Sequence, residues 1–104
     1  MRGDVHRLRV RRRTRGSEQS GSRYAVVLQS DDLLLSTVIV APTSRSAPPR
    51  IFRPTITIAG ELSQVLVEQV TAVAPERLGP LVGHVSRDEL EAINGSLRLT
   101  LELD

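Results

Sequence analysis

The sequence predicts one small domain that is mostly β-sheet. Its 104 residues suffice for a single hydrophobic core. Short runs rich in β-branched residues, such as Tyr24 to Gln29 and Thr37 to Ala41, have the length and composition of buried strands. Segments rich in proline, glycine and polar residues separate such runs, most clearly at 13–22 and 42–54. No internal repeat or second composition class marks another domain, so we expect residues 1–104 to form one unit.

The remaining segments continue this pattern. Residues 5–12 alternate in their middle, which as a strand would place Arg7, Arg9 and Arg11 on one face. Further strands are expected at 55–58, 64–73 and 81–85, with turns at 60–61 and 75–80. The sequence Ser-Asp-Asp at 30–32 is placed to cap a short helical turn that would run through residue 35.

Two patterns compete at the C-terminus. Ser86 to Glu89 has the form of a capping box. The apolar residues that follow recur as on one helix face, at Leu90, Ile93, Leu97 and Leu101. Residues 97–103 also alternate leucine with polar residues, as in a strand, and Asn-Gly at 94–95 would suit a break before such a strand. Periodicity alone leaves both arrangements open.

Charge is unevenly distributed along the chain. All 14 basic residues are arginine. Residues 1–53 hold 11 arginines and 4 acidic residues, whereas residues 54–104 hold 3 and 8. A GC-rich genome would explain the missing lysine but not the position of the arginines. A basic half favours a polyanionic partner, with nucleic acid as the first candidate.

The residue inventory excludes several classes of protein. Without cysteine there is no disulfide scaffold, thiolate zinc site or cysteine nucleophile. Tyr24 and Phe52, the two aromatic residues, are too few for a base-stacking platform. No P-loop or dinucleotide motif is present, and no cofactor or metal is expected. The chain has neither a membrane-length apolar run nor a secretory leader pattern, which predicts a cytoplasmic protein without membrane attachment.

Arginine is the best candidate for the chemistry, because guanidinium is always charged and its donors fit phosphate oxygens. Arg23 follows a glycine-containing loop and opens a buried strand, so we expect it to be held rigidly. The acidic pairs at 31–32 and 88–89 stand near expected helix starts and are interpreted as caps rather than metal ligands. His6 and His84 show no spacing that supports an acid–base pair.

Motifs along the whole chain carry a resemblance. Arg-Gly-Asp-Val stands at 2–5, Gly-Ser-Glu-Gln-Ser-Gly at 16–21, and an arginine-led apolar strand ends in Gln-Ser-Asp at 29–31. Ala-Pro-Thr-Ser follows at 41–44, Val-Glu-Gln-Val at 67–70 and Arg-Leu at 77–78. In this order the motifs resemble those of the MazF/PemK-type endoribonuclease toxins, also called mRNA interferases. The stretch 15–32 is the most specific.

The resemblance implies a small SH3-like β-barrel with a terminal helix, of the MazF/PemK/CcdB type, that acts as a homodimer. It implies metal-independent, sequence-specific cleavage of single-stranded RNA, in which the 2′-hydroxyl attacks the adjacent phosphate to give 2′,3′-cyclic phosphate and 5′-hydroxyl ends. It also implies inhibition by a cognate antitoxin protein. The substrate would be messenger RNA, with transfer or ribosomal RNA as alternatives.

Site residues carry over from the resemblance as well. The catalytic arginine of the family corresponds to Arg23. Its partner hydroxyl corresponds to Ser44 when counted from the preceding strand, which we favour, and to Thr43 when counted from the Thr-Ser pair. RNA contacts are expected from polar residues of the loops and strand ends: Arg11, Arg12, Arg13, Glu18, Gln19, Ser30, Arg45 and Gln69.

The chain also departs from the family pattern. Tyr24 stands where the family usually has proline, and His6 stands where it usually has an aromatic residue. These differences bear on RNA choice more than on fold. Two other functions remain open, a non-enzymatic CcdB-like inhibitor of DNA gyrase and a barrel that binds RNA or a partner without cutting. An arginine–hydroxyl pair beside a glycine-rich loop favours the ribonuclease.

Overall fold

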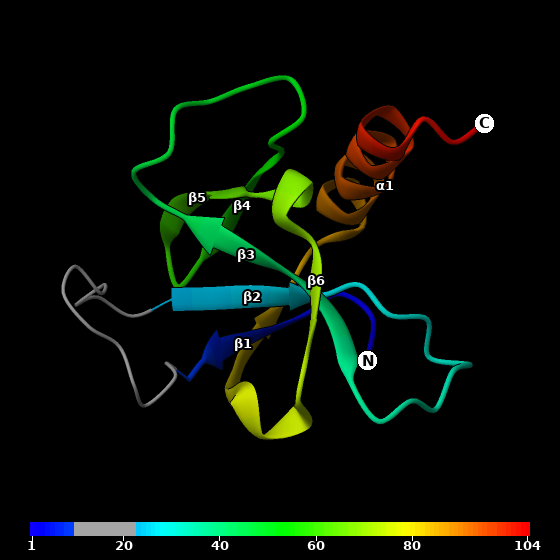
Figure 1. Ribbon diagram of the computed structural model, residues 1–104. Coiled ribbons are helices and arrows are strands. Elements are labelled where there is room, and N and C mark those ends of the chain that lie inside the picture. Colours follow the sequence, from blue (N-terminus) through cyan, green and yellow to red (C-terminus); the bar gives the residue numbers. More distant parts are fainter. Residues whose placement is uncertain (10–22) are drawn as a thin grey trace, which may run out of the picture.

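The protein, described here by a computed structural model over residues 1–9 and 23–104, is a curled antiparallel sheet with one helix (Figure 1). The strand order is β4-β5-β3-β2-β1-β7, and β6 pairs with the first part of β3. The strands are β1 Asp4–Leu8, β2 Arg23–Val27, β3 Val38–Ser44, β4 Thr55–Ile58, β5 Glu61–Val65, β6 Thr71–Val73 and β7 Leu78–His84. Two single-turn helices, η1 Val67–Gln69 and η2 Pro75–Arg77, flank β6, and α1 Arg87–Leu101 ends the fold.

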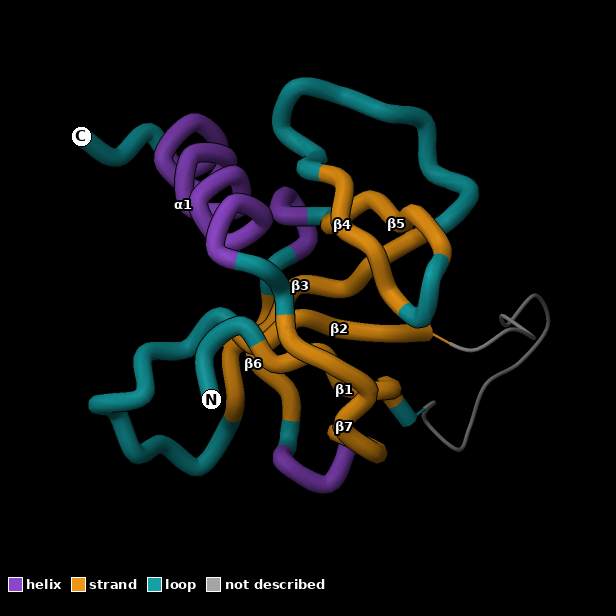
Figure 2. Tube along the Cα trace, turned by 180° about the vertical axis from the view of Figure 1, so that it is seen from behind, coloured by secondary structure: helices purple, strands orange, loops and turns teal. Residues whose placement is uncertain are grey.

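Both faces of the curled sheet carry apolar residues. On the inner face, the strands and α1 bury one cluster: Val5, Val26, Leu28, Ala41, Ile56, Ile58, Val65, Val67, Val85 and Ile93. A smaller cluster on the outer face consists of Ala25, Val27, Val40 and Val73. Alternation of side chains along each strand produces this division. The expected mainly-β fold with a terminal helix is confirmed, and Figure 2 shows α1 at one side of the strands.

The C-terminus resolves in favour of the helix. Ser86 Oγ accepts the backbone N–H of Glu89 at 3.1 Å, and Glu89 Oε1 accepts the backbone N–H of Ser86 at 2.8 Å, which completes the capping box. The helix continues through Asn94 and Gly95, so the strand alternative is wrong. Burial agrees with the helix, because Ile93 is buried and Leu90 and Leu97 pack against the core, whereas leucines 99, 101 and 103 are exposed. No helix among the described residues is long and apolar enough to cross a membrane.

Two other expectations need correction. The strand expected over 64–73 is interrupted by η1, because its two halves pair with different parts of β3: Val65 lies opposite Thr43 and Thr71 opposite Val40. The segment after β2 is a turn rather than a capped helical turn, since Ser30 accepts the backbone N–H groups of Asp32 and Leu33. Alternation of apolar and polar residues along a segment does not show where that segment changes its partner strand.

The Arg-Gly-Asp-Val opening locks one end of the sheet. Gly3 has a φ of +94°, and a Cβ there would stand 2.8 Å from the His84 ring, so only glycine fits without a shift. The Arg2 guanidinium donates to the Leu28 carbonyl at 2.9 Å and to Asn94 Oδ1 at 2.7 Å. Asp31 accepts the backbone N–H of Arg2 at 2.8 Å and caps no helix. These motif residues therefore hold the fold together.

Candidate functional site

The opposite end of the sheet, where β2 begins and β3 ends, brings Arg23 and Ser44 together. The β2–β3 register ends with Ala25 opposite Pro42, and continuing it by two residues would place Arg23 opposite Ser44. Beyond the paired residues the two strands stay in contact, because the Thr43 hydroxyl donates to the Tyr24 carbonyl at 3.2 Å. Directly opposed residues point to the same side of a sheet. If the register continues to the strand ends, Arg23 and Ser44 lie on one face.

The guanidinium of Arg23 has no hydrogen-bond or ion-pair partner among the described residues. It lies half-buried at the first position of β2, and within residues 1–9 and 23–104 it makes no side-chain hydrogen bond or ion pair. By contrast, Arg9 donates to the carbonyls of Glu76 and Leu78, and Arg53 pairs with Glu68. An anchored but uncommitted guanidinium is suited to binding an anion from solution.

The two candidate hydroxyls, those of Thr43 and Ser44, differ in burial and in their hydrogen-bond partners. Thr43 is 4% exposed and its hydroxyl is already used on the Tyr24 carbonyl. Ser44 Oγ instead accepts the backbone N–H groups of Ser46 at 3.2 Å and Ala47 at 3.0 Å, and it lies 3.4 Å from the Ser46 hydroxyl, where either oxygen can donate. An oxygen that accepts two hydrogen bonds is a better donor through its own proton. Ser44 is therefore the hydroxyl that can serve a ligand beside Arg23.

Gln64 extends the same row across the sheet, and sequence reasoning did not identify it. Gln64 pairs with Ser44 on one side and with Thr55 on the other. Its Nε2 donates to Thr55 Oγ1 at 3.0 Å, while its buried Oε1 has no hydrogen-bond partner among the described residues. A buried acceptor without a partner is costly unless a ligand or water satisfies it. The sequence of β5, Glu-Leu-Ser-Gln-Val, offers no signal that distinguishes Gln64 from its polar neighbours.

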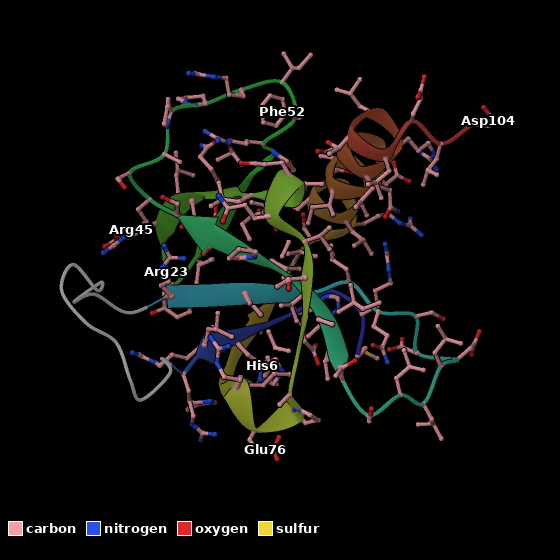
Figure 3. All side chains as sticks on the ribbon, viewed as in Figure 1. His6, Arg23, Arg45, Phe52, Glu76 and Asp104 are labelled. Atoms are coloured by element: carbon pink, nitrogen blue, oxygen red, sulfur yellow. The ribbon has the colours of Figure 1, made fainter. Side chains whose placement is uncertain are left out.

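A cavity of about 210 Å³ opens on the other face of the same sheet end. It is lined by Tyr24, Arg45, Ile58, Ala59, Glu61 and Ser63. Arg45 and Glu61 form an exposed ion pair at its rim, and the Arg7 guanidinium lies 5.6 Å from the centre of the Tyr24 ring. Figure 3 shows Arg23 and Arg45 at this end of β2 and β3. Of the residues expected to contact RNA, Arg45 thus lies near Arg23.

The other expected RNA contacts do not gather there. Ser30 lies beyond the far end of β2, where its hydroxyl accepts a backbone N–H in a turn. Gln69 is exposed in η1, next to α1 and β3. Five of the expected residues lie outside the described parts of the chain: Arg11, Arg12, Arg13, Glu18 and Gln19.

The histidines do not form a pair. His6 Nδ1 contacts the Gly79 carbonyl at 2.9 Å, whereas His84 contacts the carbonyls of Val85 and Arg2. In the β1–β7 register His84 lies opposite Asp4 and His6 opposite Leu81, so the two rings serve separate backbone contacts. Across the described residues, no three His, Asp or Glu side chains are grouped as a metal ion would require.

One carboxyl group has a perturbed pKa. Burial alone would raise the pKa of Glu68, but hydrogen bonds from the Arg53 guanidinium and from the Glu68 backbone N–H, together with the Arg53 charge, outweigh it and lower the pKa. Two guanidinium nitrogens of Arg53 donate to Glu68 Oε2, at 2.8 and 3.1 Å. This pair ties the loop before β4 to η1 and stands apart from the Arg23 row.

Known proteins resemble the chain in sequence and in fold. A protein of Mycobacterium tuberculosis named "Putative toxin" is 35% identical over 104 residues, covering 99% of this chain and 98% of that protein. The Mycobacterium tuberculosis toxin MazF-mt6 superposes with a TM-score of 0.78 at 15% identity, covering 97% of this chain and 98% of that one. MazF in the MazE–MazF crystal structure (Form-II) from Deinococcus radiodurans gives 0.78 at 22% identity, covering 98% and 95%.

A third solved structure, an endoribonuclease in complex with its cognate antitoxin from a mycobacterial species, gives a TM-score of 0.78 at 16% identity. It covers 100% of this chain and 96% of that one. At such identities these structures establish the fold. The family described as "PemK-like, MazF-like toxin of type II toxin-antitoxin system" matches residues 1–101. With residues 1–101 matched by the family and a relative 35% identical over 99% of the chain, the chain belongs to this PemK-like, MazF-like toxin family.

Proposed function

We propose that this toxin is an endoribonuclease that cleaves single-stranded RNA at specific sequences without a metal ion, through Arg23 and Ser44. The observation that supports this most directly is a guanidinium without a partner among the described residues, at the end of the sheet where β3 ends in Ser44. Membership of the toxin family, and solved relatives described as endoribonucleases, point the same way.

The proposed reaction is internal transesterification of RNA. The 2′-oxygen forms a bond to the adjacent phosphorus while the bond from phosphorus to the 5′-oxygen breaks. One proton leaves the 2′-hydroxyl and one is added to the departing 5′-oxygen, which gives a 2′,3′-cyclic phosphate and a 5′-hydroxyl. Negative charge builds up on the phosphate oxygens during this step. Arg23 would stabilise that charge, and the Ser44 hydroxyl would donate a second hydrogen bond to it.

Partners follow from the same proposal. Two structural relatives are complexes of a toxin with its antitoxin. By analogy, this chain would be held inactive by a cognate antitoxin protein and would act as a cytoplasmic homodimer of single-domain subunits. The uncommitted Arg23 guanidinium would be a natural target for an acidic antitoxin segment, because occupying it would exclude RNA phosphate.

Incubation of the purified chain with mixed cellular RNA in excess EDTA tests the proposal. We expect cleavage at short recurring sequences, with cyclic phosphate at one new end and hydroxyl at the other. The reaction as proposed needs no metal, because guanidinium and hydroxyl donors supply the charge stabilisation. A strict requirement for Mg²⁺ would instead indicate a different nuclease chemistry.

A variant set separates the proposed enzyme from a contaminating nuclease. Arg23→Ala prepared identically should be inactive, whereas Arg87→Ala, which removes an exposed arginine on the remote α1, should cut normally. Equal cleavage by wild type and Arg23→Ala would reject the assignment of the activity to this site.

A further inference from the structure

The cavity beside the proposed catalytic row is built from residues adjacent to it in the chain. Tyr24 directly follows Arg23, and Arg45 directly follows Ser44. Glu61 and Ser63, at the start of β5, complete its wall opposite Tyr24. Because neighbouring residues of a strand point to opposite faces, a phosphate on the Arg23 row and a group in this cavity would lie on either side of one sheet end.

The cavity has the size and chemistry of a ligand subsite. A water molecule needs only about 10–15 Å³, so about 210 Å³ accommodates a group far larger than water. Arg45 presents a planar fork of donors and Glu61 a pair of acceptor oxygens. Their side chains are 65% and 59% exposed, and an ion pair so exposed contributes little to stability. A ligand that replaces each partner's hydrogen bonds can therefore open the pair readily.

We propose that this cavity is a nucleobase subsite that selects guanine next to the scissile phosphate, a proposal that rests on the RNA-cleaving function above. The Glu61 carboxylate would accept hydrogen bonds from N1–H and the N2 amino group of the base. The Arg45 guanidinium would donate to O6 and N7, the bidentate contact that arginine most often makes with guanine. The Tyr24 ring would form the side wall against which the base packs.

Guanine is favoured because it alone presents two adjacent donors to one carboxylate and two adjacent acceptors to one guanidinium. Adenine would direct its N1 acceptor at Glu61, and uracil offers one donor between two acceptors. Cytosine has an amino donor but places its N3 acceptor beside it. Each mismatch would leave like-signed partial charges facing each other in the subsite.

Tyr24 supplies the aromatic ring of the cavity lining, so a residue without a ring at this position would remove the aromatic wall. The Arg7 guanidinium over the Tyr24 ring restrains that ring from one side. Tyr24 thereby links the basic N-terminal strand to base selection.

Binding of uncleavable oligonucleotides tests the proposal independently of catalysis. Short oligouridylates with 2′-fluoro sugars, which have no attacking hydroxyl, would carry one central guanine, hypoxanthine or 7-deazaguanine. Hypoxanthine lacks the N2 amino group and 7-deazaguanine lacks N7. We expect wild type to bind the guanine oligonucleotide at least about fivefold more tightly than either analogue, measured by fluorescence anisotropy at low salt.

Paired substitutions assign each contact. Glu61→Ala should abolish the preference for guanine over hypoxanthine, and Arg45→Ala the preference over 7-deazaguanine. Glu91→Ala, which removes an exposed carboxylate on α1, should preserve both. Equal binding of all three bases by wild type, or preferences that survive Glu61→Ala and Arg45→Ala, would overturn the subsite. Cleavage without base discrimination would reject this subsite alone. Base discrimination without cleavage of any RNA would reject the proposed ribonuclease alone.

Discussion

The two ends of the curled sheet differ in whether their polar groups have hydrogen-bond partners within the described structure. At the end where β2 finishes, Arg2 satisfies Leu28 and Asn94, Asp31 accepts a backbone N–H, and Gly3 packs on His84. At the end where β2 begins, the guanidinium of Arg23 and one buried oxygen of Gln64 have no partner among the described residues. The first end is a closed network and the second an open one.

This difference between the two ends distinguishes Arg2 from Arg23, two motif arginines that the sequence alone does not tell apart. Arg2 and Arg23 are both half-buried arginines that begin short motifs of the family pattern. Arg2 bridges three parts of the fold, the N-terminus, the end of β2 and α1. Arg23 bridges nothing that the structure describes. An arginine already satisfied within the fold contributes stability, and an unsatisfied one at a sheet end is available for a ligand.

The largest expected effect is loss of activity at the open end. Arg23→Ala should lower the RNA cleavage rate by about 100-fold or more, the usual consequence of removing one preorganised donor from a charged transition state. Its free energy of unfolding should stay within about 0.5 kcal/mol of wild type, because the side chain makes no hydrogen bond or ion pair with residues 1–9 and 24–104. Single-turnover cleavage and urea unfolding measure the two quantities. A rate within threefold of wild type would remove Arg23 from the mechanism.

The converse effect is expected at the closed end. Arg2→Ala should lower the free energy of unfolding by about 1.5–3 kcal/mol, because it removes charge-assisted hydrogen bonds and leaves the Leu28 carbonyl and Asn94 without their donor. Urea denaturation measures the loss, with Arg87→Ala as the charge-matched control. Cleavage per folded molecule should remain normal. A stable but inactive Arg2→Ala would mean that the two ends are not functionally distinct.

The neighbouring hydroxyls of β3 test the contrast on a smaller scale. Ser44→Ala should reduce cleavage by about tenfold or more, because a donor to the phosphate is lost. Thr43→Val should leave cleavage unchanged and destabilise the fold by about 1 kcal/mol, because its buried hydroxyl serves the Tyr24 carbonyl. Cleavage rates and urea unfolding of both variants decide between them. The reverse pattern would transfer the catalytic role to Thr43.

The smallest expected effect concerns pH. The pKa of Glu68 is lowered from its ordinary 4.5, so the native state holds the charged form more strongly than the unfolded chain does. The stability that this contributes is present above pH 4.5 and is lost as the pH falls through the lowered pKa. Urea unfolding at several acidic pH values should show this loss in wild type and a smaller one in Arg53→Met. Equal acid sensitivity would assign the loss to other carboxyl groups.

Much of the fold could be predicted from the sequence because short local patterns of residues indicate several of its strands and its helix. Runs of β-branched residues marked β2 and β3, and Ser86 with Glu89 marked the start of α1. The interruption at η1 could not be foreseen, because it depends on which part of β3 each half meets. Local composition describes what a segment prefers but not the partner it finds.

The candidate site was predictable only in part, for the same reason. The motif placed Arg23 at a strand start, but the choice between Thr43 and Ser44 needed the register with β2. Gln64 joins the row through pairing with β3, and the cavity collects Tyr24, Arg45 and Glu61 from three separate elements. No spacing within one segment carries that information.

The position of β1 has a consequence for synthesis of the protein. β1 lies between β2 and β7 in the sheet, and Arg2 reaches Asn94, which is 92 positions away in the chain. Among the described elements, β1 is therefore completed by β7 and α1, which lie far from it in the chain. Contacts so distant in sequence slow folding, and a chain emerging from the ribosome exposes β1 as an edge until β7 arrives. The sheet described here is therefore complete only after β7 and α1 have been made.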